Sequence, residues 1–162
     1  MAALNPDDET DTAPADQLPL HQFITYRLSR VQAKLNAQAT RLLRATSGIT
    51  LIQWRIIALT GAAGETRLSD LARAAALDKG LLSRNLKTLI EDDIVLSRPD
   101  ESDHRAQILS LAPRGQKIFE RTLPVTRRRQ AGLRRHLTEE ELAIFRRVLD
   151  KLEIAAEEQD FS

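Results

Sequence analysis

The sequence contains no cysteine, and its three histidines, His21, His104 and His136, are scattered along the chain. The absence of cysteine excludes a thiol redox switch and any metal site that uses thiolate ligands. Isolated histidines lack the close helical spacing at which two of them bind one metal ion. We therefore predict no metal and no cofactor.

Long apolar runs and catalytic motifs are also missing. No apolar segment approaches the roughly 18 residues of a membrane helix, and the acidic N-terminus does not have the pattern of a signal peptide. We find no serine or cysteine nucleophile with a placed histidine, and no glycine-rich phosphate loop. These absences favour a cytoplasmic protein that is not an enzyme and has no membrane partner.

The net charge of +1 hides a strong asymmetry along the chain. Residues 1–26 contain five acids and no lysine or arginine, and residues 137–162 contain eight acids against three basic residues. The middle, residues 27–136, holds 21 lysines and arginines against 10 acids, a net of +11. A basic middle indicates a polyanionic partner, with an ordinary solvated basic surface as the alternative.

Residues 1–17 have few side chains that could be buried, so we expect a disordered acidic tail. Residues 18–48 predict one long helix, which begins at Pro19 and ends near Gly48. One apolar stripe follows it at three- and four-residue steps: Leu20, Ile24, Leu28, Val31, Leu35, Ala39 and Leu42. A stripe this long and narrow favours packing against a second subunit.

A compact lobe is expected over residues 49–112. Thr50 with Gln53 three residues later forms a capping box, which predicts the start of a helix. This helix contains the single tryptophan of the chain. Gly61 and Gly64 are expected to end it.

Two further helices and a tight turn follow within the lobe. A short helix begins at Leu68, and the turn covers residues 75–78. A second helix runs from Lys79 to about Asp92, and Asp78 can cap its N-terminus.

The positions of these two helices and the turn that are expected to face inward are Leu71, Ala75, Leu77, Leu82, Leu86 and Leu89. The opposite face carries Lys79, Ser83, Arg84 and Lys87. Such a face can contact bases and phosphates in the DNA major groove, whereas the alternative is a solvated face.

A β-hairpin is predicted after these helices, from runs at residues 95–96 and 108–111, with a short strand near 66–68 beside it. In the hairpin loop, Asp103 stands two residues before Arg105, so its carboxylate can hold the guanidinium in one orientation. An oriented arginine suits the narrow minor groove. The alternative is a surface salt bridge that contributes little.

Together these elements resemble the MarR family of winged helix-turn-helix regulators. The motifs that carry the resemblance are residues 68–72, residues 79–84 with Leu86 and Leu89, Asp103-His104-Arg105, and residues 109–115. Ala112 departs from the family pattern, because a threonine there would cap the next helix. The implied fold is mainly α with a small β-hairpin wing and long N- and C-terminal dimerisation helices.

The resemblance implies a homodimer that binds a palindromic operator in double-stranded DNA, and we expect a repressor. It also implies a small aromatic carboxylate, or a related thioester, as effector. Residues that could line its site are His21, Tyr26, Trp54 and Arg55; the alternative is that Trp54 belongs to the core and Arg55 to the surface. A helical protein-interaction module without sequence-specific DNA binding is the alternative function.

Residues 113–157 predict the second dimerisation segment. A helix begins at Pro113 and extends to about Arg135, with a bend or interruption near Pro124. Thr138 and Glu141 form another capping box. The last helix has a single apolar stripe of Leu142, Phe145, Leu149, Leu152 and Ala156. The arginines at 127–129 and 134–135 are expected to pair with acids of this helix.

Overall fold

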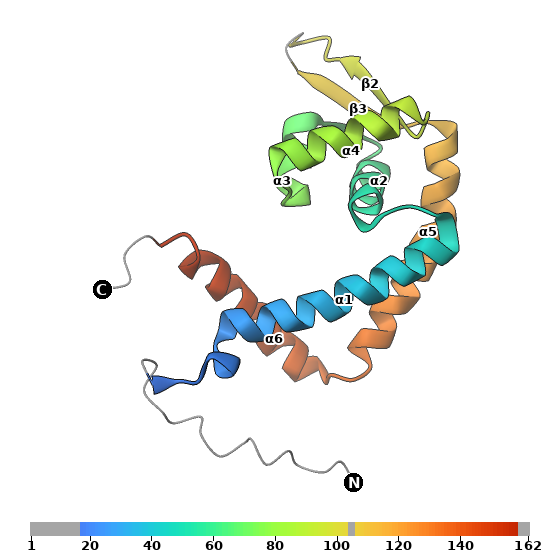
Figure 1. The fold of residues 1–162 in the computed structure, drawn as a ribbon. Coiled ribbons are helices and arrows are strands. Elements are labelled where there is room, and N and C mark those ends of the chain that lie inside the picture. Colours follow the sequence, from blue (N-terminus) through green and yellow to red (C-terminus); the bar gives the residue numbers. More distant parts are fainter. Residues whose placement is uncertain (1–16, 104–105, 159–162) are drawn as a thin grey trace.

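The computed structural model describes residues 17–103 and 106–158 (Figure 1). Its elements are η2 (Leu20–Gln22), α1 (Ile24–Ser47), α2 (Leu51–Ala63), β1 (Glu65–Arg67), α3 (Leu68–Ala75), α4 (Lys79–Glu91), β2 (Val95–Pro99), β3 (Gln107–Leu111), α5 (Pro113–Arg134) and α6 (Glu139–Ala155). The predicted mainly helical fold with a small winged sheet is confirmed. A lobe made of α2 to β3 lies at one end, and α1, α5 and α6 extend away from it (Figure 1).

The first helix begins later than the sequence predicted. Pro19 precedes a single turn of 3-10 helix, and α1 starts only at Ile24. Phe23 separates the two with φ −58° and ψ 133°, an extended conformation that no helix can contain. Gly48 ends α1 near the expected place, with φ +71° and its N–H donated to the Leu43 carbonyl. The tail up to residue 16 lies outside the described residues.

The capping box of α2 is present. Thr50 Oγ1 accepts from the Gln53 N–H at 3.2 Å, and Gln53 Oε1 accepts from the Thr50 N–H at 2.9 Å. Gly64, with φ +75°, ends the helix, but the prediction that Gly61 also ends it is wrong. At Gly61 a Cβ would lie 2.8 Å from the Phe119 ring, so this glycine permits close packing of α2 on α5.

The helix-turn-helix forms as predicted. The turn between α3 and α4 contains Ala76 with φ 46° and ψ 47°, a left-handed conformation that glycine would adopt more easily. Asp78 caps α4 by accepting from the Leu81 N–H at 2.9 Å. Leu71, Leu82 and Leu89 are buried beneath the turn. They join a core to which α1 and α5 also contribute, through Leu43 and Ile118.

Three antiparallel strands form the wing sheet in the order β1-β3-β2. The central strand β3 pairs with β1, with Thr66 opposite Leu109, and with β2, with Ser97 opposite Leu109. The short strand expected beside the hairpin is therefore present. The hairpin projects from the lobe on the side of α4 (Figure 1).

The sequence predicted a bend or an interruption near Pro124; helix α5 continues through Pro124, so the interruption is wrong and the bend stays a prediction. Its start has Pro113 in the first turn and no side-chain cap from Ala112, as expected. The capping box of α6 forms, with Thr138 Oγ1 accepting from the Glu141 N–H at 3.1 Å. No residue of α6 is buried. Among the described helices, none combines the length and hydropathy that crossing a membrane requires.

Candidate nucleic-acid interface and effector cleft

The outward face of α4 is polar and basic. Its members Lys79, Ser83, Arg84 and Lys87 are all exposed. Leu82, Leu86 and Leu89 are buried on the other side of the helix, so packing fixes which face points to solvent. Lys87 approaches Glu91 at 3.8 Å, one helical turn away. This exposed pair holds the lysine only weakly, which leaves its ammonium available to a phosphate.

Asn85 occupies a position on α4 that is usually apolar in such helices. Its side-chain amide donates to the Leu81 carbonyl at 2.9 Å, and the residue is half-buried at the edge of the core. The polar group is therefore satisfied within its own helix and needs no partner in the lobe. This contact explains how a polar residue is accommodated beside the buried leucines.

The predicted wing pair, Asp103 and Arg105, is only partly within the described residues. Arg105 and His104 lie outside them. The Asp103 carbonyl accepts from the Ala106 N–H at 2.8 Å, which shapes the end of the loop. The expected contact between Asp103 and Arg105 therefore stays a prediction.

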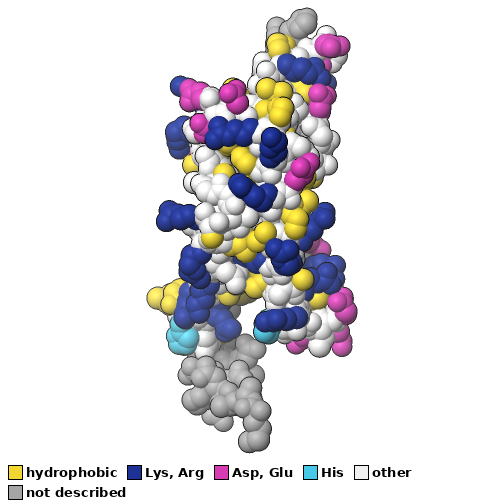
Figure 2. Space-filling view, turned by 90° about the vertical axis from the view of Figure 1, so that its right-hand side faces the viewer, with side chains coloured by type: hydrophobic (Ala, Val, Ile, Leu, Met, Phe, Trp, Pro, Cys, Tyr) yellow, Lys and Arg dark blue, Asp and Glu magenta, His cyan; other side chains and the backbone are white. Residues whose placement is uncertain are grey.

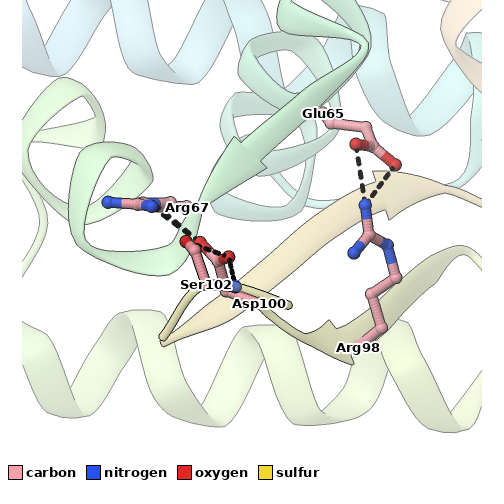
Figure 3. Close-up of polar contacts among 5 residues, drawn as sticks. All are labelled: Glu65, Arg67, Arg98, Asp100 and Ser102. Atoms are coloured by element: carbon pink, nitrogen blue, oxygen red, sulfur yellow. Dashed lines mark hydrogen bonds and ion pairs between the residues drawn. The ribbon is translucent and has the colours of Figure 1, made fainter. Parts of the chain in front are cut away.

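A polar network at the base of the wing was not foreseen from the sequence (Figure 3). Asp100 Oδ2 accepts from Arg67 Nε at 3.0 Å and lies 2.7 Å from Arg67 Nη2 in an ion pair. Asp100 Oδ1 accepts from the Ser102 N–H at 2.9 Å and from its hydroxyl at 2.7 Å. Hydrogen bonds from Ser102, and then from Arg67, lower the pKa of Asp100 to about 2. The carboxylate is therefore ionised throughout the physiological range. The one sequence feature that could have indicated this network is an aspartate two residues before a serine, a spacing at which the carboxylate can accept from the serine N–H.

A second ion pair crosses the same sheet. The Arg98 Nη2 atom donates to both carboxylate oxygens of Glu65, at 3.0 and 3.2 Å (Figure 3). Arg98 lies on β2 and Glu65 on β1, so the guanidinium spans the central strand. Both side chains are about half exposed, and solvent therefore screens this pair more than it screens Asp100.

Basic side chains extend beyond the lobe. Lysines and arginines recur from top to bottom of the face in Figure 2, between scattered acids. The prediction that the arginines of α5 pair with acids of the last helix is right for Arg134, which meets Glu139 at 3.1 Å. It is wrong for Arg129, which donates to Gln38 Oε1 at 2.9 Å and to the Leu35 carbonyl at 3.0 Å, both on α1.

The four residues predicted to line an effector site have different surroundings in the structure. Trp54 is buried and stacks on Phe119, with ring centroids 6.3 Å apart. Tyr26 is exposed beneath the Arg30 guanidinium, and His21 is exposed in η2. Arg55 lines a cleft.

This cleft has a volume of about 550 Å³ and lies between α1, α2 and the helix-turn-helix turn. Its lining residues are Asn36, Thr40, Arg44, Gly48, Ile49, Thr50, Leu51, Ile52, Arg55 and Leu77. Two cations, Arg44 and Arg55, therefore face apolar side chains across one cleft. Arg55 also donates to the Ala75 carbonyl at 3.0 Å, which connects the cleft to the last residue of α3. Within residues 17–103 and 106–158 no three potential metal-binding side chains gather.

Comparison with known proteins identifies the lobe. A model of the MarR family matches residues 47–106, which cover α2, β1, the helix-turn-helix of α3 and α4, and β2. Residues 47–106 are therefore similar to the MarR family. An uncharacterised HTH-type transcriptional regulator of Staphylococcus aureus is 29% identical over 68 residues, which is 42% of this chain and 47% of that protein. The chain thus matches about half the length of this relative.

Longer matches extend the likeness to the end helices. The HTH-type transcriptional repressor IacR of Pseudomonas putida is 24% identical over 136 residues, which is 84% of this chain and 81% of IacR. The crystal structure of NadR in complex with 4-hydroxyphenylacetate superposes with a TM-score of 0.69 at 26% identity, covering 83% of this chain and 95% of NadR. The fold of the lobe together with the end helices is therefore similar to that of a solved structure.

Proposed function

We propose that the protein is a sequence-specific DNA-binding transcriptional repressor that acts as a homodimer. The observation that carries this proposal is the exposed face of α4, with Lys79, Ser83, Arg84 and Lys87 beside a projecting wing. A helix of this kind lies in the major groove with its N-terminal residues at the base edges. Arginine can contact guanine with two hydrogen bonds, while lysine and serine contact phosphates.

The exposed apolar side chains of the end helices support the homodimer. Leu20, Ile24 and Val31 are 74%, 59% and 55% exposed, and Phe145 is 50% exposed. An acidic α6 that carries Ile144, Phe145 and Val148 on its surface is suited to cover the same region of a second copy. A twofold dimer places two copies of α4 about one helical turn apart, roughly 10 base pairs, which requires a palindromic operator. Asp103 and Arg105 complete the proposed interface at the adjacent minor groove.

The cleft between α1 and α2 supports a small aromatic carboxylate, or a related thioester, as effector. Arg44 and Arg55 provide guanidinium groups for an anion, and Ile52 and Leu77 provide apolar surface for a ring. NadR, the structural relative, was solved with 4-hydroxyphenylacetate. An anion that draws Arg55 away from the Ala75 carbonyl would remove a cap from the C-terminus of α3 and thereby shift the turn before α4.

Selection of bound sequences from random duplex DNA tests the proposed DNA recognition. We expect the parent protein to enrich a palindrome. Arg84→Ala should relax sequence choice at one position in each half-site and cost about 1–3 kcal/mol there. Arg121→Ala, which removes an exposed arginine of α5 instead, is the matched control and should leave the selected sequence unchanged. No enrichment by the parent would favour a helical interaction module.

Titration of the protein–operator complex with 4-hydroxyphenylacetate tests the effector cleft. A tenfold loss of operator affinity requires the ligand to favour the free protein by about 1.4 kcal/mol. Arg44→Gln should weaken this response without changing operator affinity in the absence of ligand. An unchanged response in Arg44→Gln would contradict the assignment of the cleft.

A further inference from the structure

We propose that Asp100 positions the wing of this protein for DNA, by joining the base of the wing loop to the start of the helix-turn-helix. The proposal rests on the DNA-binding function inferred above. It gives a role to a residue that contacts no DNA itself. The site consists of Asp100, Arg67 and Ser102, and it lies where β1, β2 and α3 meet (Figure 3).

The Asp100 carboxylate is saturated with donors. Oδ1 accepts from the N–H and the hydroxyl of Ser102, at 2.9 and 2.7 Å. Oδ2 accepts from Arg67 Nε at 3.0 Å and forms an ion pair with Arg67 Nη2 at 2.7 Å. The residue is only 8% exposed, in a loop whose other described residues are largely accessible. Hydrogen bonds to a charged, shielded carboxylate are stronger than those between neutral groups on the surface.

These contacts hold the base of the wing loop at both ends. The Ser102 bonds fix the first turn of the loop after β2. The Asp100 N–H also donates to the Ala106 carbonyl at 3.0 Å, so the residue that begins the loop is bonded to the residue that ends it.

Arg67 connects the loop to the DNA-reading part of the lobe. It is the last residue of β1 and directly precedes α3. In the sheet Arg67 is opposite Ile108 of the central strand, so its guanidinium reaches past β3 to meet Asp100 beyond the end of β2. The wing and the helix-turn-helix are therefore held in one orientation by a contact between residues 67 and 100.

A fixed wing matters because DNA binding has to immobilise every group that contacts the duplex. A loop whose base is already held gives up less conformational freedom on binding than a free loop. Removal of the Asp100 carboxylate should therefore reduce operator affinity through the wing, while the bases read by α4 stay the same. We expect about a tenfold loss of affinity, which corresponds to about 1.4 kcal/mol.

The decisive experiment measures duplex affinity against salt concentration for the parent, Asp100→Asn and Arg67→Gln. Both variants should bind about tenfold more weakly, and their salt slope should be lower by roughly one unit for each phosphate that the wing no longer neutralises. The selected operator sequence should not change. The double variant should be no weaker than either single variant, because both act through one contact. Glu65→Gln, which removes the exposed pair with Arg98, is the matched control and should cost less than about threefold.

A purely structural role predicts a different result. In that case thermal stability falls, but the salt slope and the affinity of the folded protein remain those of the parent, and the positioning role is overturned. If Asp100→Asn does not fold, Arg67→Gln decides, since Arg67 is about half exposed and its replacement leaves the Ser102 bonds intact. If the parent protein does not bind duplex DNA at low salt, the proposed function fails. If the parent binds and the variants bind with the same affinity and salt slope, the positioning role alone fails.

Discussion

The lobe and the end helices differ in how completely a single chain buries them. In the lobe, Leu71, Leu89 and Leu109 are at most 1% exposed, and they belong to a core to which the helices α1 to α5 and the sheet all contribute. In α6 no residue is buried, and Phe145 is 50% exposed. One chain therefore completes the core that supports the candidate DNA interface, whereas it leaves apolar side chains of the end helices exposed, where we propose that a second copy packs.

The difference follows from the sequence patterns of the two regions. The lobe helices α2, α3 and α4 lie close together along the chain, and α2 also packs on β3 and α5, so the same chain covers their apolar faces. The stripes of α1 and α6 lie at opposite ends of the chain, and α1 is covered mainly where it meets α5 and α2. Substitutions at the contact between the lobe and α5, on the exposed face of α6, at the base of the wing and at two buried threonines test how each region is stabilised.

Substitution of Gly115 should have the largest effect, because it disturbs the junction between the lobe and α5. A Cβ at this position would overlap the Ile94 carbonyl oxygen, which is backbone and cannot rotate away. We expect Gly115→Ala to lower the free energy of unfolding by about 3 kcal/mol or more. Urea denaturation measures it. Gly132→Ala is the control in the same helix, with open space around it, and should stabilise by about 0.5–1 kcal/mol. Equal effects would contradict the close approach.

Charge on the open surface should have the next largest effect. Phe145→Asp would place a carboxylate in the proposed dimer interface, and we expect at least a 100-fold weaker dimer, about 2.8 kcal/mol. Sedimentation over a range of protein concentrations measures it. Leu96→Asp is matched in exposure, at 52%, but lies on the wing and should leave assembly unchanged. A dimer that tolerates Phe145→Asp would remove α6 from the interface.

Local signals allowed most helix starts to be predicted from the sequence. Both capping boxes and the Asp78 cap involve residues three apart, so the pattern contains all the partners that it needs. Gly61 was misread because its role depends on Phe119, which is 58 positions later in the printed sequence and is brought close only by folding. The start of α1 was misplaced because no capping side chain marks Phe23.

In the candidate site, too, features set by nearby residues could be predicted, and contacts between distant residues could not. The outward face of α4 was readable because a helix has a fixed period, and burial of the intervening leucines agrees with it. The contact between Arg67 and Asp100 was not readable, because it depends on the register of three strands and joins residues 33 positions apart. Trp54 was considered for a ligand site, but its stacking on Phe119 could not be inferred from spacing along the chain.

Acid titration should reveal the Asp100 contact within the lobe. The pKa of Asp100 is lowered from 3.8 to about 2 in the folded protein, chiefly by hydrogen bonds from Ser102. Its stabilising contribution is therefore fully present above about pH 4 and disappears as the pH falls toward 2. Denaturation of the parent and Asp100→Asn between pH 2 and pH 6 should show a stability difference that shrinks with acid. A difference that does not change with pH would contradict the charged contact.

Two buried threonines provide the smallest and sharpest comparison. Thr60 in α2 and Thr122 in α5 are both 0% exposed. The Thr122 hydroxyl meets the Ser47 hydroxyl at 2.9 Å and so connects α5 to the end of α1, whereas the Thr60 hydroxyl has no hydrogen-bond partner among the described residues. Valine has the same shape without the hydroxyl. Removing a paired hydroxyl breaks a hydrogen bond and leaves Ser47 with one partner fewer, so Thr122→Val should lower the free energy of unfolding by about 1 kcal/mol.

Removing an unpaired hydroxyl also removes the cost of burying it, so Thr60→Val should be neutral or should stabilise the fold by up to about 1 kcal/mol. Urea denaturation of the two variants measures both values, and a destabilisation at position 60 as large as that at 122 would indicate that Thr60 has a partner in solution.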